Sequence, residues 1–143
     1  MIIIFSQMSL AFVLMFCLYM AFAMFDYQGG IANFVGIALF QPAFAVFLSL
    51  LTILLSFILG LPLRLNRKIN RWWRRNFYIS IALVMIGLGL CAASVNNNFV
   101  EETTYKIEGV ERTDTIPNRA LSILGWFAVA IGTLHTYPPL SLR

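Results

Sequence analysis

The sequence predicts an all-α integral membrane protein in which four transmembrane helices form one antiparallel bundle, with both termini in the cytoplasm. The first observation is composition: of 143 residues, 60% are hydrophobic and 11% are charged, against about 25% charged in an average soluble domain. The second is that the apolar residues gather in four stretches, each near the roughly 20 residues that a helix needs to cross a bilayer. The third is that the charges sort by loop. Soluble, disordered and collagen-like chains do not fit these numbers.

We expect the whole chain, residues 1–143, to be a single transmembrane domain. The predicted spans are residues 2–25, 31–61, 77–95 and 120–137, with a basic loop at 62–76 and an acidic loop at 96–119. Backbone amides in lipid need partners within their own segment, so helices are the expected form. The first span is expected to be retained, because no basic residue precedes its apolar run as one would in a signal peptide.

The charges of the loops predict the orientation. The loop between the second and third spans holds six basic residues and no acid, whereas all six acidic residues lie in the other two loops. Basic loops stay in the cytoplasm, so this loop and both termini are predicted to be inside. Small size and a basic loop with adjacent tryptophans are typical of four-span proteins of the bacterial inner membrane, which is the expected location.

The basic loop is the best candidate for a binding site. Its cationic residues recur at three- and four-residue spacing and are interleaved with tryptophans. Tryptophan favours the headgroup level of a bilayer, and arginine binds phosphate or carboxylate bidentately. The predicted docking residues for anionic lipid or a partner are Arg67, Lys68, Arg71, Trp72, Trp73, Arg74 and Arg75. The alternative is a topology signal with interfacial anchors and no ligand.

Gln41 and Pro42 lie within the second apolar run. Proline removes one helical amide and clashes with the preceding turn, so a kink is predicted near residues 38–42. A packing kink is the simpler interpretation, and a polar notch along a substrate path is the alternative.

The acidic loop predicts a short β-hairpin. Threonines with Tyr105, Ile107 and Val110 favour strand, and Glu108-Gly109 suits the turn. Because a two-stranded ribbon is marginal alone, we expect it to lie on the outer face of the bundle. Its carboxylates match no EF-hand spacing, and a solvated loop is the expected form.

The remaining singular residues have modest expected roles. Cys17 and Cys91 lie in apolar runs and are expected to be buried free thiols, and His135 is expected to be interfacial, beside Tyr137. No metal or cofactor site is expected. Small residues at helix-packing spacing predict close contacts. These pairs are Ala32 with Gly36, Gly89 with Ala93, and Ala128 with Gly132.

Function is predicted by elimination, since the chain contains no GxSxG, P-loop, HExxH or GxGxxG pattern. No acidic or basic residue lies within a span, which weighs against a pump or a charged pore. We expect a non-catalytic protein that acts through helix and loop contacts, as an accessory subunit of a membrane complex or as an immunity-type protein. Its expected partners are anionic membrane lipids and another membrane protein or a second copy, and no nucleic acid. The alternatives are an oligomeric channel or small transporter and, less favoured, a lipid-modifying enzyme.

Overall fold

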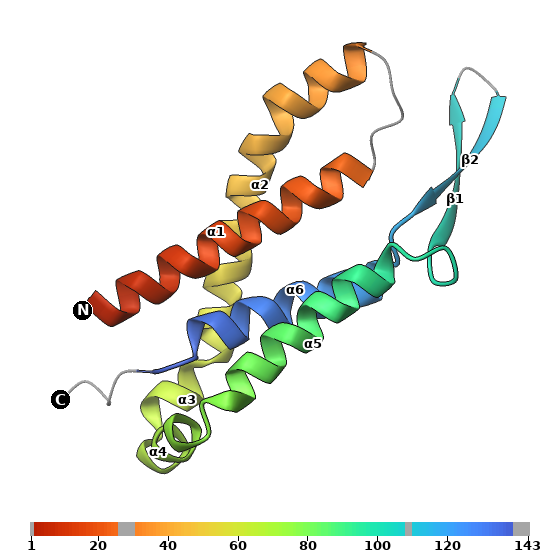
Figure 1. Cartoon of the computed structure of the whole chain (residues 1–143). Helices are drawn as coiled ribbons and strands as arrows, with labels where there is room; N and C mark the ends of the chain where they lie inside the picture. Colours follow the sequence, from red (N-terminus) through yellow and green to blue (C-terminus); the bar gives the residue numbers. More distant parts are fainter. Residues whose placement is uncertain (1, 26–30, 108–109, 139–143) are drawn as a thin grey trace.

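The computed structural model describes residues 2–25, 31–107 and 110–138, which form six helices and two strands (Figure 1). Two long helices come first, α1 (Ile2–Phe25) and α2 (Ile31–Leu59). Neither contains a charged residue. At about 1.5 Å per residue, each is longer than the roughly 30 Å hydrocarbon core. Both are therefore long and apolar enough to span a membrane.

The segment predicted as a loop at 62–76 is instead largely helical. It contains α3 (Leu61–Leu65) and α4 (Arg67–Arg75), and α5 (Tyr78–Ser94) follows at once. The axes of α4 and α5 differ by 75°. If this bent pair is counted as one span, the described residues contain three candidate membrane spans.

The last elements are the predicted hairpin and one more apolar helix. β1 (Glu101–Ile107) pairs antiparallel with β2 (Val110–Ile116), which confirms the two strands. Their turn, predicted at residues 108–109, lies outside the described residues. α6 (Arg119–Leu134) follows, and the Asn118 side chain caps it by accepting a hydrogen bond from the Leu121 amide at 3.0 Å.

The hairpin does not lie on the bundle as expected. Figure 1 shows the ribbon projecting beyond the ends of α5 and α6. Its base is held by local bonds: Glu101 accepts from the Arg119 amide at 3.1 Å, and the Asn118 amide donates to the Ser94 carbonyl at 2.8 Å. The ribbon is therefore stabilised by hydrogen bonds at its base and not by packing on the surface of the bundle.

Helix α6 is the centre of the packing, because it contacts α1, α2 and α5. Glycines let α5 and α6 approach closely. A Cβ atom on Gly87 would lie 2.7 Å from the Gly125 carbonyl oxygen, and one on Gly125 would lie 2.7 Å from Cys91 Sγ. Of the small-residue pairs expected from the sequence, Gly132 faces α5, whereas a Cβ on Gly36 or Gly89 would meet nothing within 4 Å.

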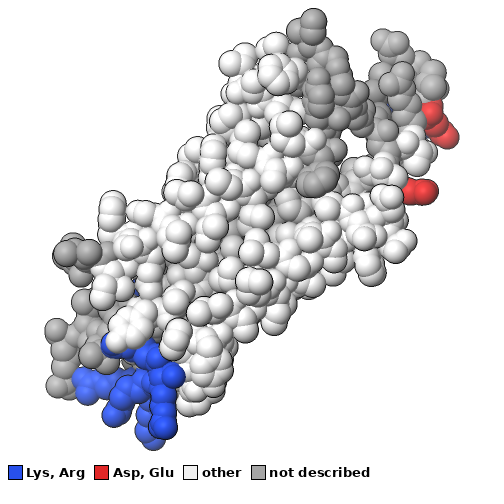
Figure 2. All heavy atoms as spheres, in the orientation of Figure 1, with Lys and Arg blue, Asp and Glu red and all other residues white. Residues whose placement is uncertain are grey.

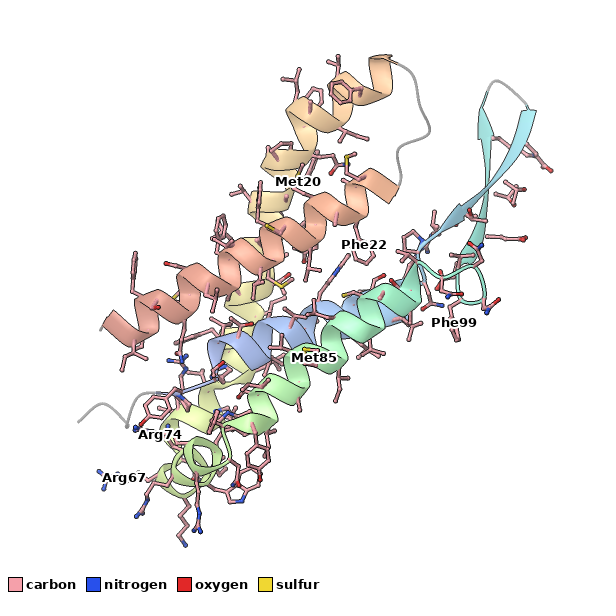
Figure 3. The ribbon with its side chains drawn as sticks, viewed as in Figure 1. Met20, Phe22, Arg67, Arg74, Met85 and Phe99 are labelled. Atoms are coloured by element: carbon pink, nitrogen blue, oxygen red, sulfur yellow. The ribbon has the colours of Figure 1, made fainter. Side chains whose placement is uncertain are left out.

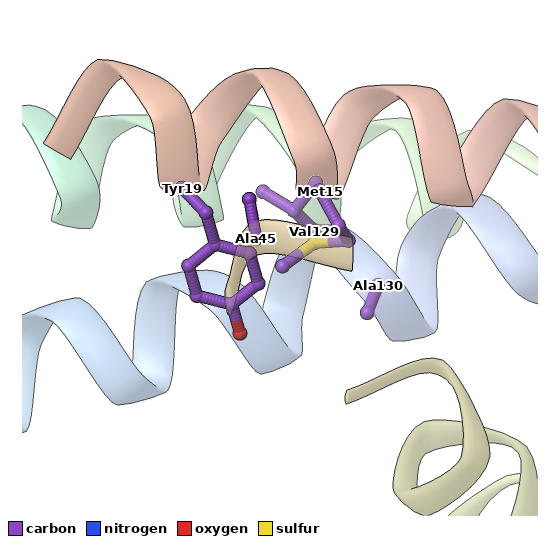
Figure 4. Packing of buried hydrophobic residues seen from close by; sticks show 5 residues of the cluster. All are labelled: Met15, Tyr19, Ala45, Val129 and Ala130. Carbon is purple, nitrogen blue, oxygen red and sulfur yellow. The ribbon is translucent and has the colours of Figure 1, made fainter. Parts of the chain in front are cut away.

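The buried apolar core lies where α1, α2 and α6 meet. Its main cluster is made by Met15, Tyr19, Ala45, Val129 and Ala130 (Figure 4). A second cluster joins Ala11, Ile53 and Leu134 from the same three helices. The core is small, and many large apolar side chains of α1 and α2 remain exposed, among them Phe5 at 75% and Leu39 at 67%. Such exposure is expected of helices that face lipid or a partner.

The coarse fold predicted from the sequence is confirmed: the chain is mostly helical, with two to three apolar helices of membrane length and a short antiparallel ribbon. Four crossings remain a prediction. α6 has 16 residues, and at about 1.5 Å per residue it is shorter than the core of an average bilayer. The same holds for α5, which has 17 residues.

Candidate functional site

The basic segment forms a defined helix, α4, because its first turn is capped. Asn66 accepts hydrogen bonds from the amides of Lys68 and Ile69, at 3.0 and 3.3 Å. The helix dipole favours the arginines of the last turn but opposes Arg67 and Lys68 in the first turn. Those two cations therefore gain no stabilisation from the dipole of α4.

One face of α4 is an exposed cationic surface, which we call the basic face. It consists of Arg67, Lys68, Arg71, Trp72 and Arg75, all exposed. Among the described residues these four cations make no salt bridge, since both ion pairs found there, Lys106 with Glu111 and Arg119 with Glu101, lie at the hairpin. Figure 2 shows Lys and Arg gathered at one end of the molecule and Asp and Glu at the other. Figure 3 shows the Arg67 side chain pointing away from the helices.

The other face of α4 is fixed to the end of α6. Trp73 donates its indole N–H to the His135 carbonyl at 2.7 Å and to Ser80 Oγ at 2.9 Å. Arg74 donates to the Tyr137 hydroxyl, and its guanidinium lies 4.0 Å from the centre of the Tyr137 ring. The structure thus separates the predicted docking residues: five are exposed, while Trp73 and Arg74 hold the helix in place.

A buried polar cluster supports this attachment, and we call it the α6 clamp: Arg64, Trp73, Ser80 and His135. Arg64 is only 8% exposed; it donates to the Leu134 carbonyl at 2.9 Å and to His135 Nδ1 at 3.4 Å. Its guanidinium also lies 4.8 Å from the Phe57 ring centre. Burial lowers the pKa of Arg64, but arginine stays protonated in proteins. The guanidinium cation of Arg64 is therefore stabilised by neutral hydrogen-bond acceptors at the end of α6. These hydrogen bonds hold α3 against α6.

The His135 side chain is buried among protein groups, with no exposed surface, and its expected depth at the membrane interface stays a prediction. Its Nε2 atom lies 3.3 Å from the Ser56 carbonyl oxygen. Gly60 makes room for the ring, because a Cβ there would lie 1.8 Å from Nε2. No local sequence pattern predicts this cluster, since Arg64 and His135 are 71 residues apart.

The second predicted feature, Gln41 with Pro42, lies in α2, and the helix runs through Pro42 from Ile31 to Leu59. The kink therefore remains a prediction. Gln41 does line a half-open cavity of about 390 Å³ between α1, α2 and α6. This cavity lies at the hairpin end, away from α4, because Ile116, Pro117 and Arg119 also line it.

The cysteines and the described acidic residues form no further candidate site. Cys91 is buried, but Cys17 is exposed on α1, which corrects the expectation that both are buried; both are free. Within the described ranges, no group of three or more His, Cys, Asp or Glu side chains could hold a metal ion.

Comparison with known proteins gives no relative from which a function could be carried over: no family model, no curated protein and no solved structure matches this chain significantly.

Proposed function

We propose that this chain is a small, non-catalytic, multi-pass protein of the bacterial inner membrane, in which α4 lies on the cytoplasmic surface and binds the phosphates of anionic lipids. Through this contact and its exposed helices it acts as an accessory subunit of a membrane complex or as an immunity-type protein. The observation that carries the proposal is the exposed basic face of a helix bent 75° from the apolar α5.

The angle supports a position along the membrane surface. If α5 crosses the bilayer along the membrane normal, α4, whose axis is 75° away, lies close to the membrane plane. Trp72, 55% exposed, then lies at the headgroup level, where tryptophan is favoured. Each basic residue near an anionic surface contributes about 1 kcal/mol of attraction.

The distribution of charge supports the proposed orientation. On the face shown in Figure 2, an uncharged body separates the basic end from the acidic end. Figure 1 shows the start of α1 and the end of α6 on the same side of the molecule as α4, opposite the hairpin. This arrangement supports an even number of crossings with α4 and both termini inside. In this proposal the short α5 and α6 reach both surfaces through local thinning of the bilayer.

A stripe of exposed residues on α2 supports contact with another membrane protein. Large apolar side chains recur at alternating four- and three-residue steps, the spacing of helices that pack side by side. They are Phe40, Phe44, Phe47, Leu51, Leu54 and Ile58, each at least 41% exposed. Purification in a mild detergent tests this contact: we expect a stoichiometric partner or a second copy, and loss of it in Phe44→Ala with Phe47→Ala. A wild-type protein that purifies as a lone monomer would contradict it.

The lipid contact can be tested with quenching of tryptophan fluorescence by brominated lipids. A Trp126→Phe background leaves only Trp72 and Trp73, both on α4. In bilayers that mix neutral and anionic lipid, we expect stronger quenching when the brominated lipid is the anionic one. Arg67, Arg71 and Arg75 changed together to Gln should remove most of this preference, a loss of up to about 3 kcal/mol at about 1 kcal/mol per residue.

Two controls make the result specific. A variant with Lys at the same three positions keeps the charge and should keep most of the preference for anionic lipid. Any loss in this variant measures the contribution of bidentate hydrogen bonds from arginine to phosphate. Lys106→Gln removes one charge at the exposed hairpin and should change nothing. If the Gln variant keeps its topology and its anionic preference at low ionic strength, α4 is a topology signal only.

The second candidate function, an oligomeric channel or small transporter, is favoured by one observation. Gln41 contributes a polar group to a cavity between three apolar helices. Solute flux in proteoliposomes tests it: flux that Gln41→Leu abolishes would favour this function, and no flux above empty vesicles would exclude it.

A further inference from the structure

The helical form of the basic segment gives its cations defined positions relative to one another. Asn66 caps the first turn of α4, and Trp73 and Arg74 attach the helix to the end of α6. Because the helix itself is held in place, the exposed cations of the basic face differ from one another only by their height and angle on one rigid cylinder. Their spacing can therefore select a ligand, as well as their charge.

Arg71 is the neighbour of all three other cations on the basic face. On an α-helix, residues three or four positions apart lie side by side, with about 5–6 Å between their Cβ atoms. Arg67 and Lys68 precede Arg71 by four and three positions, and Arg75 follows it by four. The remaining pairs are not neighbours: Arg67 and Lys68 point about 100° apart, and Arg75 lies about 10–12 Å further along the axis than either.

No protein group neutralises these adjacent charges within the described part of the chain. None of the four cations forms a salt bridge there, and the segment 62–76 contains no acidic residue. Arg71 donates from Nε to the Arg67 carbonyl at 3.4 Å, a bond that leaves its terminal nitrogens available to an anion. Like charges four residues apart destabilise a helix. A ligand with two negative groups about one turn apart would remove this repulsion.

We propose that Arg71 and its neighbours select a phospholipid with two phosphates in one headgroup, of which diphosphatidylglycerol is the type. Its phosphates are joined by a three-carbon bridge, about as long as the 5.4 Å pitch of one helical turn. One phosphate contacts Arg71 and the other contacts an adjacent cation. The first contact makes the second one intramolecular, an advantage that two separate one-phosphate lipids lack. This inference rests on the proposed function, because it requires α4 at the headgroup level.

The test compares two brominated lipids in the Trp126→Phe background, whose remaining tryptophans both lie on α4. Phosphatidylglycerol has one phosphate and two acyl chains, and diphosphatidylglycerol has two phosphates and four acyl chains. Equal phosphate therefore means equal charge and equal quencher. Each lipid is titrated into phosphatidylcholine bilayers. We expect diphosphatidylglycerol to reach half-maximal quenching at about fivefold less phosphate, as expected when one further basic residue is engaged.

Variants that lose the same charge separate spacing from charge. Arg71→Gln leaves no neighbouring pair on the basic face, so the two lipids should quench equally at equal phosphate while both remain preferred over phosphatidylcholine. Arg67→Gln and Arg75→Gln each keep two neighbouring pairs and should keep the difference between the lipids. Arg71→Lys retains the central charge and should keep most of the difference, which provides a second reading if Arg71→Gln does not fold.

The outcomes distinguish this inference from the proposed function. Equal quenching of the unsubstituted α4 by the two lipids at equal phosphate would overturn the inference and leave lipid binding by α4 intact. The same fall in the difference for Arg71→Gln and Arg75→Gln would also overturn it, because charge alone would then explain the preference. If neither anionic lipid quenches more strongly than brominated phosphatidylcholine, the proposed function fails, and the inference fails with it.

Discussion

Gly60 packs so closely against the His135 ring that no side chain fits at position 60 without moving the ring. Gly60 has φ of −85°, a conformation open to any residue, so its role is steric. Gly60→Ala would place Cβ 1.8 Å from His135 Nε2, and we expect a loss of about 1–3 kcal/mol in the free energy of unfolding, as for other overpacked sites.

Gly36→Ala is the matched control, because a Cβ there meets nothing within 4 Å. It should leave stability unchanged or raise it by up to about 1 kcal/mol. Thermal unfolding in detergent measures both variants. Equal midpoints for the two would show that His135 does not occupy the buried position described.

The two neighbouring tryptophans should behave differently. Trp73→Phe removes the single indole N–H that Ser80 Oγ and the His135 carbonyl share, so we expect a loss of about 1 kcal/mol in the free energy of unfolding. Trp72→Phe, at a 55% exposed site, should cost less than about 0.5 kcal/mol. Unfolding midpoints in the same detergent compare them, and a larger effect at Trp72 would contradict the assignment of the two faces.

Contacts between residues far apart in the chain could not be predicted from the sequence. The burial of His135 and Arg64 depends on segments 71 residues apart, and no local pattern reports such a distance. The Gly87–Gly125 approach is missed for the same reason, since spacing within one helix does not reveal which face meets a neighbour. An apolar run likewise does not tell whether Cys17 faces the core or the lipid.

At the scale of elements, hydropathy predicted the long helices well. The first predicted span, 2–25, coincides with α1, because an uncharged run longer than a bilayer has few other folds. The segment 62–76 was predicted as a loop, although its three- and four-residue spacing of cations already indicated a helix. The hairpin strands followed from threonine and aromatic content, but their position beyond the helices depends on contacts with Asn118 and Arg119.

Pro42 offers a test of element geometry. Proline cannot donate to the Ala38 carbonyl, and Pro42→Ala restores that bond. We expect the variant to fold at least as stably and α2 to become straighter, seen as a longer distance between spin labels at Phe34 and Ile58, both exposed. Gln41→Ala, which keeps the proline, is the control. An unchanged distance in Pro42→Ala would show that α2 has no kink.

At the scale of the whole molecule, charge separation and packing give a consistent account. α6 holds α1, α2 and α5 together, and the α6 clamp fixes the basic helix at one end. The hairpin and its carboxylates lie at the other end. The sequence predicted this polarity from loop charges alone, whereas the arrangement around α6 depends on contacts between distant segments.

The sidedness of α4 is the central claim, and cysteine labelling tests it most directly. Single cysteines are introduced at two exposed positions, Lys68→Cys on α4 and Thr104→Cys on β1, in a background without Cys17 and Cys91. The Lys68→Cys variant keeps the five other basic residues of the segment. We predict that a membrane-impermeant maleimide labels position 104 in intact cells and position 68 only after the cells are permeabilised. Labelling of position 68 in intact cells, with position 104 protected, would contradict the account.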